Sequence, residues 1–131
     1  MYLTKNELEI MDVLWSAGRP LSRGEILSFS EEKSWMDSSV HILLNSMLKK
    51  QAIREAGFVK CGKTCGRVYA PGVTCEEYYA STLNVTKTVP ALPQLLEAIV
   101  AERGTTVKEI QAMEKLLKAK KAELKAEKNE L

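Results

Sequence analysis

The residues whose types and spacing most suggest a chemical function lie between positions 57 and 64. The letters Gly57-Phe-Val-Lys-Cys-Gly-Lys-Thr64 fit the pattern of a phosphate-binding loop, in which backbone N–H groups and a lysine hold a nucleotide phosphate. Such a loop follows a buried strand and opens a helix, whereas the residues from Gly66 onward predict a strand. We therefore treat the match as coincidental. Since no Ser/His/Asp or paired-carboxylate arrangement is present either, we expect a protein that is not an enzyme and needs no cofactor.

Cysteine chemistry is the second possibility raised by this stretch. The chain has three cysteines, and Cys61 and Cys65 are four residues apart, with Cys75 nearby. His41 is the only histidine. Because zinc sites usually take four ligands in closely spaced pairs, we expect no metal site and three reduced thiols. A metal- or redox-responsive regulator that uses Cys61 and Cys65 is the alternative.

The charges of the chain are unevenly distributed. The 131 residues carry 19 Lys and Arg against 17 Asp and Glu, a formal charge of +2, which excludes a simple polycation. Residues 1–36 have four basic and six acidic side chains, residues 37–73 have six and two, and residues 74–131 have nine of each. A basic surplus confined to the middle segment suits contact with nucleic-acid phosphates, although a lysine-rich solvated surface would look the same.

Capping boxes mark where the helices that position these residues must begin. In each box a hydroxyl side chain accepts from an early backbone N–H group, and a glutamate three residues later reaches back. The four boxes are Thr4/Glu7, Ser22/Glu25, Thr74/Glu77 and Thr106/Glu109, and the first three also have a hydrophobic staple. With the apolar periodicity, they predict helices over about 5–17, 22–28, 37–51, 75–84, 92–103 and 107–128.

Between the third and fourth predicted helices, the spacing of apolar residues changes to the alternation that is typical of a β-strand. Residues 53–61 and 67–70, around a glycine-rich turn at 62–66, predict a β-hairpin that Pro71 ends. Three helices followed by a hairpin form the plan of a winged helix-turn-helix domain. We thus expect a mainly α protein, with a winged-helix domain at 1–73 and a helical dimerisation region at 74–131.

The third helix and the hairpin supply the candidate DNA contacts. The helix buries Val40, Leu43, Leu44, Met47 and Leu48 on one side, which leaves a polar side for the major groove. The candidates for base contact are Ser38, Ser39, His41, Ile42, Asn45 and Ser46. The candidates for phosphate contact are Lys49, Lys50, Lys60, Lys63 and Arg67. A winged-helix module that binds protein through this surface is the competing interpretation.

These residues resemble the BlaI/MecI/CopY family of penicillinase-type repressors. The resemblance lies in Leu3–Trp15, Pro20–Ile26, Trp35, Ser39-Val40, Leu43–Lys50, Ile53-Arg54 and Val68–Pro71, and it covers residues 3–80 well. It implies a dimeric repressor with an N-terminal winged helix that binds double-stranded DNA operators of two-fold symmetry, commonly with TACA/TGTA elements. It also implies, for the penicillinase branch, a membrane sensor metallopeptidase as a partner.

Several positions depart from the family pattern. Met36 stands where the family has the Ser or Thr that caps the recognition helix, so that Asp37 or Ser34 would have to cap it instead. Ile42 and Ser46 replace a Thr and an Arg on the outward face. Residues 97–100 lack the Asn-Phe dipeptide that is cleaved in the penicillinase branch, and the C-terminal region lacks the Cys-x-Cys pairs of the copper-responsive branch. The resemblance therefore leaves the inducing signal open.

The C-terminal helices carry the expected dimer contacts. Ile110, Leu117 and Leu124 recur every seven residues, and Lys120 and Glu127 interrupt the other heptad position, so a long coiled coil is not expected. The candidates for dimerisation are Tyr78, Leu95, Ile99, Ile110, Met113, Leu117 and Leu124. A solvated, charged tail is the alternative. Without a secretory signal or a long apolar segment, we expect a cytoplasmic protein that does not insert into membranes.

Overall fold

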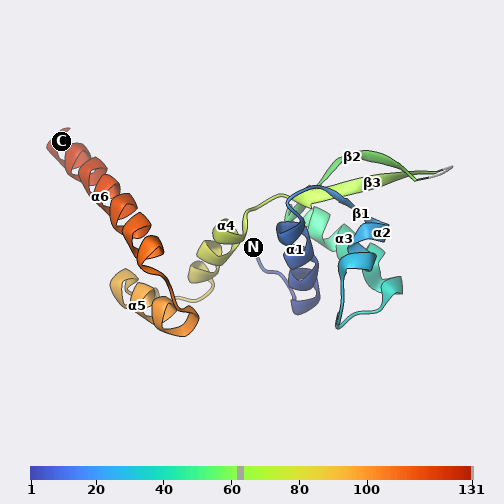
Figure 1. Cartoon of the computed structure of the whole chain (residues 1–131), viewed down its shortest axis with the longest axis horizontal. Coiled ribbons are helices and arrows are strands. Elements are labelled where there is room, and N and C mark those ends of the chain that lie inside the picture. The colour runs from blue at the N-terminus through green and yellow to red at the C-terminus, as the bar shows by residue number, and fades with distance from the viewer. Residues whose placement is uncertain (62–63, 131) are drawn as a thin grey trace. The chain divides into compact units, whose positions relative to one another are not determined.

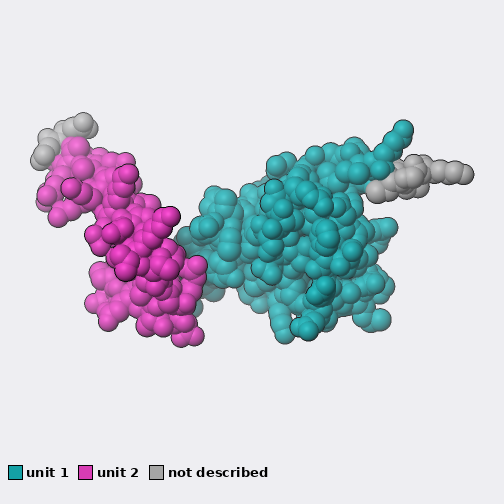
Figure 2. All heavy atoms as spheres, viewed as in Figure 1, with its two compact units in different colours: residues 1–87 teal, residues 88–131 magenta. Residues whose placement is uncertain are grey.

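The computed structural model describes residues 1–61 and 64–130, and side chains for residues 1–60 and 66–128. The chain divides into two compact units, residues 1–87 and 88–131 (Figure 2). Unit 1 contains helices α1 to α4, the 3-10 helices η1 and η2 and a small sheet, whereas unit 2 contains α5 and α6 (Figure 1). The predicted arrangement of three helices followed by a hairpin wing is confirmed.

The three stapled capping boxes form as predicted. Helix α1 (Lys5–Ala17) starts at Thr4, whose hydroxyl accepts from the Glu7 N–H group, and it ends at Gly18 with a left-handed φ of 66°. Helices α2 (Arg23–Phe29) and α4 (Cys75–Ser81) begin in the same reciprocal way. Local sequence therefore determines where these helices begin.

The recognition helix begins without a side-chain cap, contrary to our expectation. The 3-10 turn η1 (Asp37–Ser39) leads into α3 (Val40–Lys49), and neither has a side-chain hydrogen bond at its N-cap. Ser34 instead donates its hydroxyl to Asn6 (2.7 Å) and its backbone N–H to Glu9 (2.9 Å). Asp37 pairs with the Lys33 ammonium at 2.6 Å. Both residues that we expected to cap α3 therefore bond to other residues and hold the segment before α3 in place.

The wing is longer than predicted and belongs to a three-stranded sheet. Strands β2 (Ile53–Cys61) and β3 (Thr64–Pro71) form the antiparallel hairpin, so residues 64–66 lie in a strand and not in the expected turn. The remaining turn residues, 62 and 63, lie outside the described part of the chain. A short strand that we did not predict, β1 (Leu21–Ser22), pairs with β3, and the strand order is β1-β3-β2.

One core holds unit 1 together. Its buried side chains come from helices α1 to α4, from the base of the sheet and from the adjoining segments, and they are Leu3, Ile10, Met11, Leu14, Leu21, Ile26, Trp35, Val40, Leu44, Met47, Ala52, Ile53 and Tyr78. The predicted inner face of α3 is confirmed, with Leu43 and Leu48 packed at the edge of this core. Trp35 is buried in this core, and the half-buried Trp15 packs against the core.

Helix α4 packs within unit 1. Tyr78 is only 6% exposed, and its ring lies 6.1 Å from that of Trp15. The Trp15 indole N–H also donates to the Val73 carbonyl at 3.0 Å, which fixes the segment that leads into α4. We expected the boundary at residues 73 and 74, but by contacts it falls after the short 3-10 turn η2 (Thr82–Asn84), at residues 87 and 88.

Unit 2 consists of two helices without a core of their own. Helix α5 (Leu92–Arg103) ends at Gly104, and α6 (Val107–Glu130) follows, so both lie where the sequence predicts them. Among the described side chains of this unit, none is buried. Two helices that bury no side chain cannot account for their own stability, because helices of this length depend on packing of an apolar face.

Candidate nucleic-acid interface

The outer face of α3 brings together three of the six predicted base-contact residues, Ile42, Asn45 and Ser46. Ile42 is 74% exposed, and Asn45 and Lys49 are also exposed. These three residues line a hollow of about 440 Å³ together with Ser46 and Lys50. The face thus combines an amide, a hydroxyl, an apolar side chain and two ammonium groups, which is a combination that can contact base edges and phosphates.

The start of the recognition helix adds an arginine that the sequence analysis missed. Ser38 and His41 are exposed and Ser39 is half-buried. The guanidinium group of Arg23, at the first position of α2, donates to His41 Nε2. Arg23 lies in the acidic first segment of the chain, where the local sequence gives no sign of a DNA contact. Only the crossing of α2 and α3 brings its charge to the recognition surface.

Glu7 is a buried carboxylate that ties the recognition helix to α1. It is 1% exposed, and it accepts hydrogen bonds from the Lys50 ammonium at 2.6 Å, from the Ser46 hydroxyl at 2.8 Å and from the Thr4 backbone N–H at 2.9 Å. Burial raises the pKa of Glu7, but the bonds from Lys50, Thr4 and Ser46 together hold it below the ordinary value of 4.5. Glu7 therefore stays ionised at neutral pH.

The same contacts engage two of the candidate DNA contacts. Lys50 and Ser46 are half-buried, and both direct their polar atoms at Glu7. The Lys50 ammonium also lies 5.9 Å from the ring centre of Tyr2, an exposed residue. Of the residues that line the hollow on this face, Ile42, Asn45 and Lys49 are accordingly those that do not bond to Glu7.

The wing carries the remaining phosphate candidates. Lys60 is exposed on β2, and Arg67 on β3 forms an exposed ion pair with Glu55 at 2.9 Å. Exposed pairs of this kind contribute little to stability and exchange readily, so the pairing does not exclude Arg67 from phosphate contact. Lys63 lies outside the described residues, as do the side chains of Cys61 and Cys65, on which the metal- or redox-responsive alternative depends.

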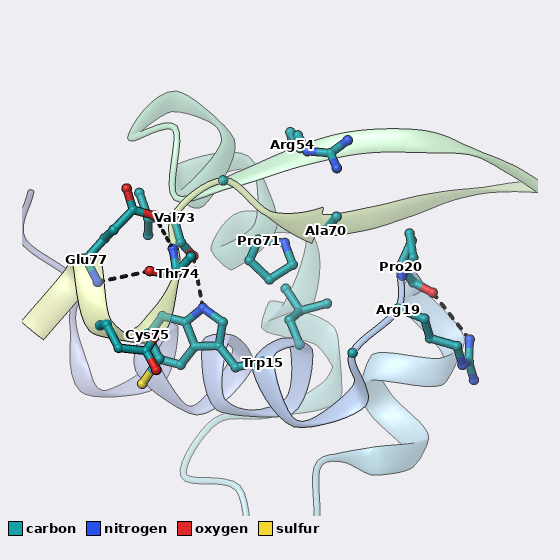
Figure 3. A pocket seen from close by; sticks show the side chains of 14 residues that line it. Trp15, Arg19, Pro20, Arg54, Ala70, Pro71, Val73, Thr74, Cys75 and Glu77 are labelled. Carbon is teal, nitrogen blue, oxygen red and sulfur yellow. Dashed lines mark hydrogen bonds between the residues drawn. The ribbon is translucent and has the colours of Figure 1, made fainter. Parts of the chain in front are cut away.

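A second hollow, of about 530 Å³, lies between the end of α1, the base of the wing and the start of α4 (Figure 3). In this view Glu77 lies on the left and the guanidinium groups of Arg19 and Arg54 lie on the right. Arg19 is paired with Glu25 at 2.7 Å, and Glu77 is used in the cap of α4. None of the predicted DNA contacts within the described part of the chain lines this hollow, which separates it from the outer face of α3.

Two further features concern metals and membranes. Among the side chains that the structure describes, those of residues 1–60 and 66–128, no group of three His, Cys, Asp or Glu residues could hold a metal ion. The thiol of Cys75 is free and half-buried. No helix within this described part has both the length and the apolar character needed to cross a membrane.

The dimerisation candidates divide into two groups. Tyr78 is buried in the core of unit 1, so its ring is not available at the surface. In unit 2, Ile99, Leu117 and Leu124 are 48%, 55% and 55% exposed. Leu95, Ile110 and Met113 are half-buried. Six of the seven candidates therefore lie on helices in which no described side chain is fully buried.

Comparison with known proteins identifies the family. The penicillinase repressor family matches residues 3–119 of the chain. An uncharacterized 16.5 kDa protein from the ptsI 3' region of Latilactobacillus sakei is 29% identical over 126 residues, which cover 92% of this chain and 81% of that protein. The solved structure of Bacillus subtilis PadR in complex with operator DNA is 18% identical, with a TM-score of 0.47, and covers 95% of this chain and 76% of the PadR chain. With a winged-helix domain at its N-terminus and a family match over nearly its whole length, the chain belongs to the penicillinase repressor family of DNA-binding transcriptional repressors.

Proposed function

We propose that the protein represses transcription as a homodimer on an operator of two-fold symmetry, with α3 of each protomer in a major groove. The observation that carries this proposal is the exposed outer face of α3, where Ile42, Asn45 and Lys49 lie together. A major groove admits one helix, and the side chains on this exposed face could then contact base edges. Occupying a promoter in this way would exclude other proteins from it.

The side chains of α3 suggest how bases would be read. The amide of Asn45 can pair with adenine through two hydrogen bonds, and the apolar Ile42 can contact a thymine methyl group. Ser38, Ser39 and His41 lie at the helix start, where recognition helices make their first contacts. We assign Ser46 a weaker part in base reading because its hydroxyl is donated to Glu7.

Phosphate contacts would supply most of the affinity. We assign them to Lys49 at the end of α3, to Lys60, Lys63 and Arg67 on the wing, and to Arg23 at the start of α2. Lys50 has a different role in this scheme, since its ammonium group neutralises Glu7. Each phosphate neutralised releases counterions, so affinity should fall steeply with salt.

A second copy of the chain is the best candidate to cover the helices of unit 2. The apolar side chains of α5 and α6 that we expect at the interface are Leu95, Ile99, Ile110, Met113, Leu117 and Leu124. Leaving them in water would be costly, at about 25 cal/mol for each Å² of apolar surface. Pairing two copies through identical patches covers this surface, and it presents two recognition helices with the symmetry that a two-fold operator requires.

One experiment tests both parts of the proposal. Purified full-length protein is used to select binding sites from a library of random duplex DNA, and the mass of the protein alone and in the complex is measured by light scattering. We expect an inverted repeat to be enriched and two protomers to bind each duplex. The variant N45A should lose the preference at one base position in each half-site, whereas Q51A, just beyond α3, should select the same sites. Selection of no sequence, or of sites without symmetry by a monomer, would contradict the proposal.

A further inference from the structure

The wing has an exposed aromatic side chain that the scheme above does not use. Phe58 on β2 is 70% exposed, and its neighbour Val59 is 42% exposed. Figure 1 shows that the described strands β2 and β3 extend beyond the helices of unit 1. A phenyl ring in this position has no part in the core of the domain.

A β-bulge turns Phe58 toward one particular face of the wing. Glu55 pairs with Tyr69 and Phe58 pairs with Arg67, so Ala56 and Gly57 together stand opposite a single residue of β3. Three positions along a regular strand would put Phe58 on the face opposite to Glu55, but the extra residue returns it to the same face. Gly57 adopts a φ of 126°, a conformation that side chains rarely allow, which fixes the bulge at this place.

The face selected by the bulge continues from the core of the domain and is basic. At the base of the wing it carries Ile53, which is in the core, and Tyr69, which packs against the core. Further out it carries Phe58, with Arg67 directly opposite on β3 and Lys60 two residues along β2. Val59 lies on the other face. A phenyl ring is thus placed between two cations on the side of the hairpin that joins the helices.

We propose that Phe58 enters the minor groove beside each half-site as an apolar wedge, while Lys60 and Arg67 hold the phosphates on either side. This inference rests on the proposed function and adds a residue that determines specificity. Side chains of this kind partly unstack a base step and bend the duplex, and pyrimidine–purine steps unstack most easily. Phe58 would therefore favour such steps in the flanking DNA without forming any hydrogen bond to a base.

Charge favours DNA over a protein occupant of this face. The two side chains that flank Phe58 are both cationic, and the nearest carboxylate on the same face, Glu55, is already paired with Arg67. A polyanion with an apolar interior, such as stacked DNA, complements an aromatic ring between two positive charges. A second copy of the same face would bring like charges together instead.

The test compares F58A with V59A, which removes an exposed apolar side chain one residue away on the opposite face. Both full-length variants and the wild type are used to select sites from random duplex DNA, and the bend of the selected duplex is measured by energy transfer between its ends. We expect F58A to keep the core of the half-site, to lose the flanking pyrimidine–purine step, to bend DNA less, and to bind about tenfold more weakly with an unchanged salt slope. V59A should behave like the wild type.

Each other result has a defined meaning. Wild-type flanking preference, bend and affinity in F58A would overturn the wedge and leave the repressor function standing. Equal losses in F58A and V59A, or a change of oligomeric state in F58A, would also overturn it, because they indicate a general effect on the wing or a protein contact. If the wild type itself selected no duplex DNA, the proposed function would fail, and the wedge with it.

Discussion

The carboxylate of Glu7 accepts a hydrogen bond from the Lys50 ammonium at 2.6 Å, and this contact joins the first helix of the domain to the end of its recognition helix. Lys50 is the C-cap residue of α3, and Ser46, one turn earlier, reaches the same carboxylate at 2.8 Å. Two points of attachment on one helix face fix both the rotation and the position of that helix. Glu7 thus acts as a positioning residue for the surface that would read DNA.

Replacing Glu7 by Gln should destabilise the protein. The amide keeps the capping box, because Gln serves there as well as Glu, but it loses the ionic bond to Lys50 in a buried site. We expect the free energy of unfolding to fall by about 1–3 kcal/mol in urea titrations at neutral pH. The matched control is E77Q, which makes the same change in the exposed capping box of α4. Equal effects of the two substitutions would contradict a special role for the contact with Lys50.

Acid should weaken the wild type more than E7Q. The pKa of Glu7 is below its ordinary value of 4.5 in the folded protein, so the folded state gives up this proton more readily than the unfolded state. The contribution is complete above the unfolded pKa and is lost as the pH falls through the folded one. Unfolding free energies measured between about pH 6 and pH 3 should therefore drop more steeply for the wild type than for E7Q. Glu9, Glu25 and Glu77, whose pKa values are also lowered, remain in both proteins.

The two neighbouring lysines at the end of α3 should differ in DNA binding. Lys49 is exposed, whereas the Lys50 ammonium is bonded to Glu7. If Lys49 of each protomer neutralises one phosphate, K49Q should reduce the slope of log affinity against log salt by about 1.8 for the dimer, and K50Q should leave that slope unchanged. Binding is measured by fluorescence anisotropy at several salt concentrations, after circular dichroism has shown that both variants are folded. A reduced slope in K50Q alone would reverse this assignment.

Much of the fold follows from local signals in the sequence. Thr4/Glu7, Ser22/Glu25 and Thr74/Glu77 each form the capping box that the sequence predicts, because a capping box depends on residues three positions apart. The apolar face of α3 is buried as predicted for the same reason, because the spacing of its apolar residues can be read within a single helix. Pro71 ends β3 since its ring cannot continue the ladder.

Features that depend on distant residues were not predictable. The strand β1 consists of Leu21 and Ser22 alone, too short to show a period, and it forms only because β3 lies beside it. Glu7 seemed fully used by its capping box, and its bonds to residues 39 and 43 positions away required the packing of two helices. Tyr78 was assigned to a dimer interface because nothing local indicates that Trp15 contacts its ring.

Arg23 should contribute to DNA binding although it lies in the acidic segment of the chain. Its guanidinium group is exposed and bonded to His41, which holds the charge beside the start of α3. We expect R23A to weaken binding to a selected duplex and to lower the salt slope by about 1.8, since each protomer of the dimer loses one phosphate contact. R103A, which removes an exposed arginine of unit 2, should bind like the wild type. Unchanged affinity and salt slope in R23A would show that Arg23 contacts no phosphate.

A charge placed in the apolar seam of α6 should separate the protomers. Leu117 is 55% exposed and lies in register with Ile110 and Leu124, one heptad before and after it. In a dimer, L117E would bury two unpaired carboxylates facing the same seam, a cost that the contact cannot offset. We expect L117E to be monomeric by light scattering at micromolar concentration and to bind a two-fold site far more weakly than the wild type. The control is A119E, which adds the same group about 200° further around the helix and should stay dimeric. If L117E kept the mass of the wild type, whether dimer or monomer, the seam would not be the interface between protomers.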